Sequence, residues 1–176
     1  MSHSQWEKKK YKKAASEGKT SKLFTKLVRA ITMEAKKALG NRESPGLKLV
    51  IQKARDVNMP SDNIERAIKK ATEPGAAMEH ITYEAYGPGG VGIIIEALTD
   101  SRNRASQEIK FILSEHGANL GAIGSVTWGF TKNSVDSDWT PTMTVPLSEE
   151  DSEKLSALID ELEDNDDIQA VFVNAE

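Results

Sequence analysis

Residues 81–98 read ITYEAYGPGGVGIIIEAL, and this stretch decides the fold because apolar runs approach strand-like alternation on both sides of a glycine-rich turn. We therefore predict strands at 81–86 and 91–98. The turn at 87–90 lies between two strand patterns and lacks the Gly-Lys-Ser/Thr sequence that opens the helix of a phosphate-binding Walker loop. Gly and Pro fit a tight turn without a ligand, so a hairpin is the preferred interpretation.

The sequence after this hairpin predicts an α+β domain over residues 78–176. Its expected elements are a helix at 102–116, strands at 125–130 and 142–146, a helix at 148–164 and a last strand at 168–173. If the first strand is set aside as an extra N-terminal hairpin strand, the order is β-α-β-β-α-β. That order is typical of the ferredoxin-like, or split-βαβ, arrangement.

The sequence before the hairpin has helical periodicity and predicts a three-helix domain over residues 21–75. The first helix is expected at 21–39, capped by Thr20 or Ser21. The second runs from Ser44-Pro45 to about Asn58. The third ends before Pro74-Gly75, and Asp62 and Glu65 at its start have capping-box spacing. The linker at 73–77 separates the two domains. Residues 1–20 show no apolar periodicity and are predicted to form a basic arm.

The formal net charge of −4 divides unevenly between the two halves. Residues 1–75 carry 18 Lys/Arg against 8 Asp/Glu, a net of +10, and residues 76–176 carry 5 against 19, a net of −14. Such asymmetry indicates a nucleic-acid or other polyanion partner for the basic half.

The basic arm and the first helix supply the candidate nucleic-acid contacts. Lysines can neutralise phosphates and an aromatic residue among them can stack on an exposed base. The candidates are Trp6, Lys8, Lys9, Lys10, Tyr11, Lys12, Lys13, Lys19, Lys22, Lys26 and Arg29. The alternative is a solvated tail that only increases solubility.

Arg102 and Arg104 suggest a second anion site, joined by Lys110. A helix capped by Asp100 or Ser101 would place both arginines in its first turn, where the helix dipole disfavours cations. A broken local rule of this kind is expected at a functional surface, and arginines beside free N–H groups suit a phosphate or carboxylate. The alternative, which we weigh equally, is that both arginines pair with acids of their own domain.

Other chemistries are disfavoured. The sequence has no Cys, and His3, His80 and His116 lack the spacing of metal ligands. It therefore predicts neither a metal site nor a cofactor. It also lacks a convincing acid/base pair, so we do not expect an enzyme. The longest apolar run is far shorter than the roughly 20 residues that span a membrane, and no secretory signal is evident. The acidic helix at 148–164 could dock a basic protein or the chain's own arm.

Several motifs in the same order resemble the YebC family. They are HSQW at 3–6, KLFTKL at 22–27, NMPSDNIERAIKK at 58–70, YEAYGPGG at 83–90, LTDSRNR at 98–104, HGANLG at 116–121 and GSV at 124–126. The resemblance implies a cytoplasmic, non-enzymatic protein of gene expression. Members are usually described as DNA-binding transcriptional regulators, whereas mitochondrial and some bacterial relatives are associated with translation on the ribosome.

The chain departs from that family at two places. Ser2 and Gln5 stand where the family usually has Gly and Lys. The family also has a third domain inserted after the strand expected at 125–130, whereas here residues 132–140 pass almost directly to the next strand, which indicates a short form. We predict a DNA-binding transcriptional regulator. The alternatives are a ribosome-associated or RNA-binding translation factor and, more distantly, an acidic protein-interaction module.

Overall fold

The computed structural model describes residues 17–74 and 78–176, and the chain divides into two compact units. The helical unit comprises the described residues up to Pro74, and the sheet unit begins at Glu79. Each unit has its own core, and each is described by itself below.

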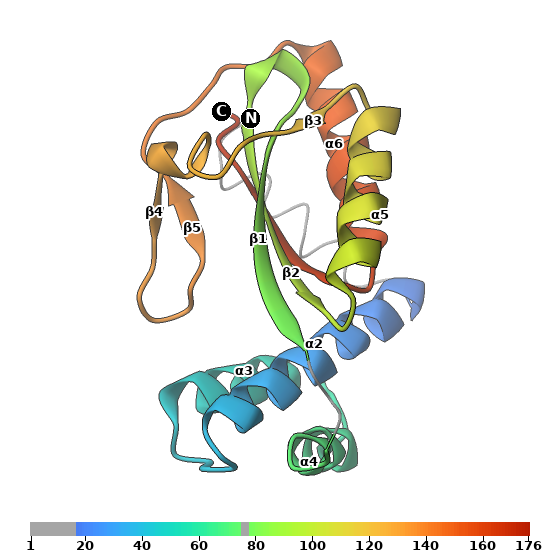
Figure 1. Cartoon of the computed structure of the whole chain (residues 1–176), viewed down its shortest axis with the longest axis vertical. Helices are drawn as coiled ribbons and strands as arrows, with labels where there is room; N and C mark the ends of the chain where they lie inside the picture. Colours follow the sequence, from blue (N-terminus) through green and yellow to red (C-terminus); the bar gives the residue numbers. More distant parts are fainter. Residues whose placement is uncertain (1–16, 75–77) are drawn as a thin grey trace. The chain divides into compact units, whose positions relative to one another are not determined.

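The helical unit consists of three helices joined by short turns (Figure 1). They are α2 (Glu17–Lys37), α3 (Pro45–Asp56) and α4 (Ser61–Lys70). All three predicted helices are present, but α2 begins four residues before the expected start. Thr20 and Ser21, the expected caps, therefore lie inside the helix, and residues 17–20 do not belong to an irregular arm.

Positive backbone φ angles end the first two helices. Leu39 and Gly40 have φ of 50° and 79° after α2, and the Gly40 N–H donates to the Ala35 carbonyl (2.9 Å). Asn58 has φ of 60° after α3. Glycine and asparagine adopt this left-handed conformation at low cost, which explains why the chain can turn here.

The capping box expected at the start of α4 is wrong. Pro60 is the N-cap and Asp62 lies within the first turn, so its side chain is not the cap. Glu65 instead forms a two-bond ion pair with Arg42, which precedes α3. Asp62 and Glu65 do have the spacing of a capping box. The fold, however, brings Arg42 close to Glu65, and the guanidinium attracts the Glu65 carboxylate more strongly than a backbone N–H does.

The apolar stripes of the three helices meet in a small core. Its largest fully buried side chains are Ile31 and Leu47, and Ile64 from α4 packs with them. The hydroxyl of Thr32 donates to the carbonyls of Val28 (2.9 Å) and Ala67 (3.2 Å), so this buried polar group is satisfied and links α2 to α4.

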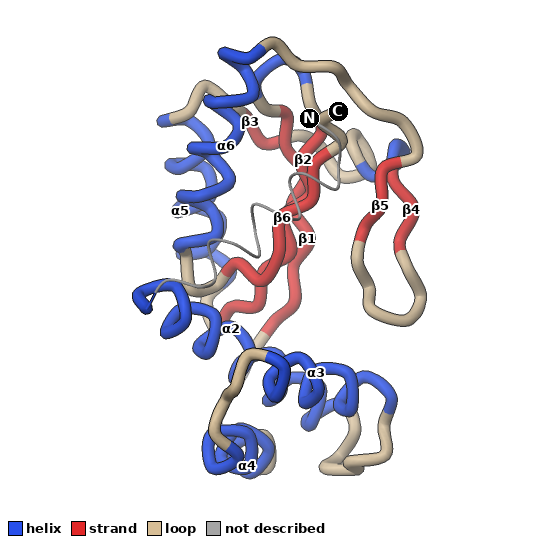
Figure 2. The backbone as a smooth tube through the Cα atoms, turned by 180° about the vertical axis from the view of Figure 1, so that it is seen from behind, coloured by secondary structure: helices blue, strands red, loops and turns tan. Residues whose placement is uncertain are grey.

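The sheet unit is built on a four-stranded antiparallel sheet with the strand order β3-β1-β2-β6 (Figures 1 and 2). Its strands are β1 (Glu79–Tyr86), β2 (Gly92–Thr99), β3 (Asn119–Leu120) and β6 (Ile168–Val173). A short 3-10 turn, η1 (Pro88–Gly90), joins β1 to β2, which confirms the hairpin predicted from the glycine-rich sequence.

The α+β class is confirmed, but the predicted strand arrangement is not. The first strand is not an extra one, because β1 occupies an inner position between β3 and β2. Both neighbours of β1 are antiparallel to it, so β2 and β3 run parallel on either side of it and α5 (Arg102–Glu115) connects them. This connection is a split βαβ unit whose inserted strand comes from earlier in the chain.

The strands expected at 125–130 and 142–146 are wrong. Residues 127–129 form a 3-10 turn, η2 (Thr127–Gly129), and a separate two-stranded sheet follows, formed by β4 (Phe130–Lys132) and β5 (Trp139–Pro141). Val145 makes only an isolated bridge to Ala175. The place that the ferredoxin-like order assigns to a later strand is already filled by β1, so this segment cannot join the main sheet.

Two layers cover the main sheet. Helices α5 and α6 (Glu149–Asp164) lie on one face, and the β4–β5 hairpin lies on the other (Figures 1 and 2). Every residue of β2 is buried, because both faces of this strand are covered. Ile93 and Ile95 pack with the helices on one face, and Ile94 packs with Val126 and Phe130 on the other. A strand buried on both faces explains the unbroken apolar run in the sequence.

Candidate nucleic-acid interface

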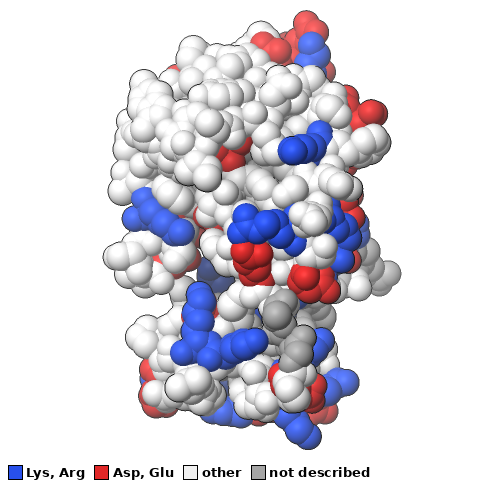
Figure 3. All heavy atoms as spheres, in the orientation of Figure 1, with Lys and Arg blue, Asp and Glu red and all other residues white. Residues whose placement is uncertain are grey.

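The charge division of the sequence persists in the described parts of the two units. Residues 17–74 carry 13 Lys/Arg against 7 Asp/Glu, a net of +6, and residues 79–176 carry 5 against 19, a net of −14. In the view of Figure 3, blue side chains lie at the front and along the lower rim of the helical unit, while red side chains of the sheet unit lie along one edge and also beside blue ones lower down. A polyanion would therefore be attracted by the first unit and repelled by most of the second.

Six of the 13 cations in residues 17–74 have a local explanation. Each of its helices carries two basic residues in its last turn. They are Lys36 and Lys37 in α2, Lys53 and Arg55 in α3, and Lys69 and Lys70 in α4. Cations at a helix C-terminus interact favourably with the helix dipole, so these six residues are explained without any ligand.

Lys22, Lys26 and Arg29 lie in the middle of α2, so the helix dipole does not account for their position. At about 100° per residue, Lys26 is about 40° and Arg29 about 20° around the helix from Lys22, on opposite sides of it. Ile31, which is fully buried, lies about 180° away on the same count. The structure thus places three of the predicted site residues on one stripe of α2, opposite the core, and we call them the α2 stripe.

The remaining candidates of the arm lie outside what can be described. Trp6, Tyr11 and the lysines at 8, 9, 10, 12 and 13 precede the described residues. Lys19 lies within α2, where only the backbone is described. Their contact with nucleic acid stays a prediction.

Arg102, at the start of α5, pairs with an acid of its own unit. Its guanidinium forms two hydrogen bonds with the Glu79 carboxylate at the start of β1, one of them 3.2 Å from Nε to Oε2. The Glu79 hydrogen bonds raise the pKa of Arg102, and the same contacts lower the pKa of Glu79. Both side chains are about half exposed, so this pair lies at the surface.

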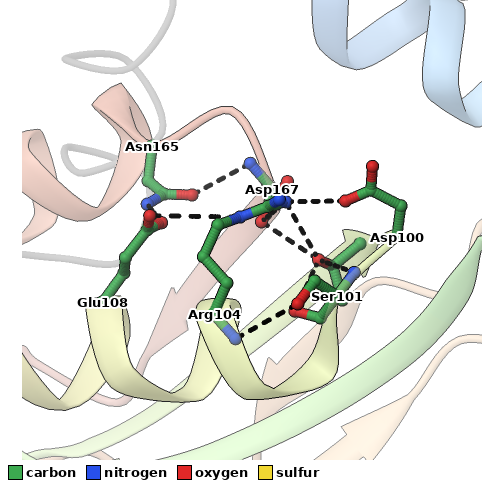
Figure 4. A network of polar contacts seen from close by, with 7 residues as sticks. Asp100, Ser101, Arg104, Glu108, Asn165 and Asp167 are labelled. Atoms are coloured by element: carbon green, nitrogen blue, oxygen red, sulfur yellow. Dashed lines mark hydrogen bonds and ion pairs between the residues drawn. The ribbon is translucent and has the colours of Figure 1, made fainter.

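Arg104 lies at the centre of a larger network, drawn in Figure 4. Its Nη2 contacts Asp167 Oδ2 (2.9 Å) and Asp100 Oδ1 (2.7 Å). The Asp167 side chain is only 4% exposed and also accepts a hydrogen bond from the Thr99 hydroxyl (3.0 Å). Hydrogen bonding to Asp167 is the main cause that raises the pKa of Arg104. Arg104 thus neutralises a buried carboxylate that precedes β6.

These contacts give the two arginines a local role, as the alternative interpretation expected. Ser101 is the N-cap of α5, and its hydroxyl accepts a hydrogen bond from the Arg104 N–H (3.4 Å). Lys110 is exposed further along α5. An anion at this place would compete with Glu79, Asp100 and Asp167 for the guanidinium groups, and binding there stays a prediction.

Glu84 is a buried carboxylate with a structural role that the sequence pattern did not single out. It is 6% exposed, and it accepts hydrogen bonds from the backbone N–H groups of Gly124 (2.6 Å), Val126 (2.9 Å) and Thr127 (2.7 Å). Burial alone would raise the pKa of Glu84, but the three backbone donors hold it below its ordinary value. The carboxylate on β1 therefore fixes the loop that precedes β4.

Glu96, on β2, plays the same part for the β4–β5 hairpin. It is 6% exposed and accepts hydrogen bonds from the Trp139 indole (2.6 Å) and the Thr82 hydroxyl (2.9 Å), with His80 Nε2 at 2.7 Å. Burial opposes ionisation, but His80 and then Trp139 lower the pKa of Glu96 below its ordinary value. An acid within each apolar strand pattern was the available signal for both glutamates, because a charge that the fold buries must be paired.

The described residues contain no group of three or more His, Cys, Asp or Glu placed to hold a metal ion. His116 contacts Glu161 of α6 (2.5 Å), so its role here is to join α5 to α6. Within the same described residues, none of the helices combines the length and apolar character needed to cross a membrane.

These features define a class of protein: a basic helical unit followed by an acidic sheet unit, with buried carboxylates that fix loops. Comparison with known families identifies the member of that class. A model described as the TACO1/YebC protein N-terminal domain matches residues 4–74, and one described as the TACO1/YebC second and third domain matches 78–136 and 133–175. The chain therefore belongs to the TACO1/YebC family, which confirms the resemblance.

Curated relatives carry the name "Probable transcriptional regulatory protein". One from Rubrobacter xylanophilus is 50% identical over 76% of this chain and 55% of its own length, so that alignment spans about half of the relative. One from Fervidobacterium nodosum is 37% identical over 98% of this chain and 92% of its own length. A crystal structure of a conserved hypothetical protein from Aquifex aeolicus has 30% identity and a TM-score of 0.80, covering 91% of each chain.

The relatives are longer than this chain. The alignment with a protein from Thermoanaerobacter pseudethanolicus spans 236 positions, whereas this chain has 176 residues. The two segments matched by the second family model meet at 133–136, in the turn between β4 and β5. Together these findings place the extra residues of such relatives at that turn, which agrees with the expected short form.

Proposed function

We propose that this protein is a nucleic-acid-binding regulator of gene expression that grips the phosphate backbone through the α2 stripe and performs no catalysis. The first candidate is transcriptional regulation through DNA, because the relatives are named as transcriptional regulatory proteins. The second is binding of ribosomal RNA in translation. Both need the same phosphate contacts, and none of the described residues has an arrangement typical of base-specific readout.

One observation carries the proposal: Lys22, Lys26 and Arg29 share one stripe of α2, away from both helix ends and opposite the core. The helix dipole acts only within the first and last turns, so it does not account for cations there. Three cations spaced over two turns can each contact a phosphate, and each contact releases condensed counterions. Such binding is sequence-tolerant and sensitive to salt.

The matched test compares two variants that remove the same charge from different places. The first combines Lys22→Gln, Lys26→Gln and Arg29→Gln, and the control combines Lys53→Gln, Lys69→Gln and Lys70→Gln at helix ends. On duplex DNA, the slope of log K against log[salt] should fall by about 2 to 3 for the first variant, since each phosphate contact contributes about 0.9. The control slope should change by less than about 1.

Equal slopes for the two variants would show that only net charge matters and would remove the α2 stripe from the proposal. Glutamine has a helix propensity close to those of lysine and arginine, so circular dichroism should show unchanged helix content in both. To separate the two candidates, the protein is crosslinked in cells and the recovered nucleic acid is sequenced. A predominance of ribosomal RNA would overturn the transcriptional candidate in favour of the second.

A further inference from the structure

Three apolar side chains stand out on the surface of the sheet unit, around the loop at 121–129. Trp128 is 69% exposed, Tyr86 is 43% exposed and Ile123 is 99% exposed. Single exposed apolar residues are common, but two exposed aromatic side chains bonded to the same carbonyl need an explanation. The third tryptophan of the chain, Trp139, shows the contrast, because its indole is half-buried and donates to the buried Glu96.

The two rings are neighbours and are held in place. The Tyr86 hydroxyl and the Trp128 indole N–H both donate to the same oxygen, the Ser125 carbonyl, and each lies 2.8 Å from it. Both polar tips are therefore satisfied at the base of the rings. The apolar parts of the rings remain available to a ligand, which is the usual arrangement of tyrosine and tryptophan at binding surfaces.

The loop beneath the rings is rigid for a reason already described. The Glu84 carboxylate accepts three backbone N–H groups on both sides of Ser125, and the Gly121 N–H donates to the Glu84 carbonyl (2.8 Å). A Cβ at Gly121 would come within 3.2 Å of the Tyr86 ring, so the ring lies against the backbone there. A surface fixed before binding loses little conformational entropy when a ligand arrives.

Apart from the buried Glu84 carboxylate, which is bonded to three N–H groups, the chain segments near the two rings carry no charge in an otherwise acidic unit. Residues 117–131 contain no charged residue, and neither do residues 139–147. Figure 3 shows a wide white area where Figure 1 places the loops that flank β4 and β5. The 19 acids of residues 79–176 would repel a polyanion from most of the sheet unit, but the repulsion is weakest over this area.

We propose that Tyr86 and Trp128 form a stacking platform for unpaired bases of a single-stranded nucleic acid. The inference rests on the proposed function, because it specifies the form of nucleic acid, single-stranded, that the protein would bind. Every base has a π-face, so stacking is tolerant of sequence, in keeping with the lack of base-specific readout. A basic protein partner would instead be attracted to the acids of α6, away from an uncharged surface.

The test uses the full chain with two probes, oligo(U) RNA of about 20 nucleotides and the duplex that it forms with oligo(A). Oligo(U) is chosen because its bases are unpaired. Trp128→Ala should weaken binding of oligo(U) by about 5- to 150-fold and leave binding of the duplex nearly unchanged. The salt slope should not change, because stacking releases no counterions. The matched control, Phe111→Ala, removes an exposed ring from α5 and should affect neither probe.

A rescue variant separates stacking from folding. Trp128→Phe loses the hydrogen bond to Ser125 but keeps an aromatic ring. Because the ring can still stack on a base, this variant should recover most of the affinity for oligo(U). The platform is refuted if Trp128→Ala binds oligo(U) as the wild type does, or if it weakens both probes equally. The proposed function fails separately if the wild-type chain binds neither nucleic acid, or if the α2 stripe variant keeps its salt slope.

Discussion

The two units of this protein use charge in different ways. In the sheet unit, acids reach into the interior: Glu84, Glu96 and Asp167 are each nearly buried, and each fixes a loop or a neighbouring strand through hydrogen bonds. Among the described residues of the helical unit, no charged side chain is buried, and the cations lie along helix surfaces.

The comparison teaches that the net charge of a unit does not report its role. The sheet unit has the larger net charge, yet its most informative charges are structural, and both of its arginines pair with its own acids. The smaller positive charge of the helical unit includes three cations that lie on one stripe of α2, away from the helix ends and opposite the core. The location of a charge therefore indicates its function better than its sign. Four measurements test this contrast.

The largest expected effect comes from Glu84→Ala. Removing the carboxylate leaves three backbone N–H groups without their partner, and an unsatisfied buried donor costs about 1–3 kcal/mol. Because water can reach part of the loop, we expect the free energy of unfolding of the sheet unit to fall by about 3 kcal/mol in total. Urea denaturation measures this loss, and Glu153→Ala, at an exposed position of α6, is the control. Similar losses in the two variants would contradict a structural role for Glu84.

The next contrast is between the two arginines of α5. Arg104→Ala leaves the buried Asp167 without its guanidinium partner, whereas Arg102→Ala removes a partner only from the half-exposed Glu79. Thermal unfolding should therefore show a clear drop in the melting temperature for Arg104→Ala and almost none for Arg102→Ala. Equal melting temperatures would mean that Asp167 does not depend on Arg104. A loss of nucleic-acid binding in Arg102→Ala, with stability intact, would instead support the second anion site.

Acid should weaken the sheet unit through Glu84 and Glu96. The pKa of each is lower in the folded protein than the ordinary value of 4.5, so the folded state favours the ionised form. The contribution of the two carboxylates to the free energy of unfolding is complete when the pH is above the ordinary pKa of 4.5. It is lost as the pH falls through the lower pKa values of the folded state. Chemical denaturation at a series of pH values below about 5 should show this loss. The Glu96→Gln variant should show a shallower pH dependence, and an unchanged profile would argue against the ionised form.

The smallest effect compares the serine caps of two helices. In the sheet unit, the Ser148 hydroxyl accepts a hydrogen bond from the Asp151 N–H (3.1 Å) at the start of α6. In the helical unit, Ser44 precedes α3 but makes no side-chain cap bond. Ser148→Ala should cost about 1 kcal/mol, and Ser44→Ala only a few tenths. Equal costs in denaturation experiments would show that the cap hydrogen bond adds nothing at Ser148.

Much of the local structure could be predicted, because it depends on residues close together in sequence. The apolar stripes gave the positions of α3, α5 and α6 to within a few residues, and the glycine-rich turn gave the β1–β2 hairpin. The errors were of another kind. The strands predicted at 125–130 and 142–146 were wrong, because strand-like composition does not decide which segment occupies a given position in the sheet. The position beside β2 that one of them would have taken is occupied by β1.

The candidate site followed the same division. The stripe at Lys22, Lys26 and Arg29 depends on helical spacing alone; the sequence named all three residues as candidates, but their shared face was not recognised. The pairing of Arg104 with Asp167 joins residues 63 positions apart, and the sequence offered it only as one of two alternatives. Tyr86 and Trp128 were not recognised as a pair, because their shared bond to Ser125 exists only after β1 and η2 meet.

The helices, the β1–β2 hairpin, the separation of positive from negative charge and the family could all be inferred from the sequence alone, because periodicity, composition and motifs are properties of neighbouring residues. Only the tertiary structure decided the strand order, the partners of the arginines and buried glutamates, and the exposure of the two aromatic rings. These features depend on contacts between segments that are far apart in the sequence. Such contacts form only when the chain is folded. The uncharged surface around Trp128 is one such consequence, since its two segments, 117–131 and 139–147, flank a hairpin that the sequence assigned to the wrong strands.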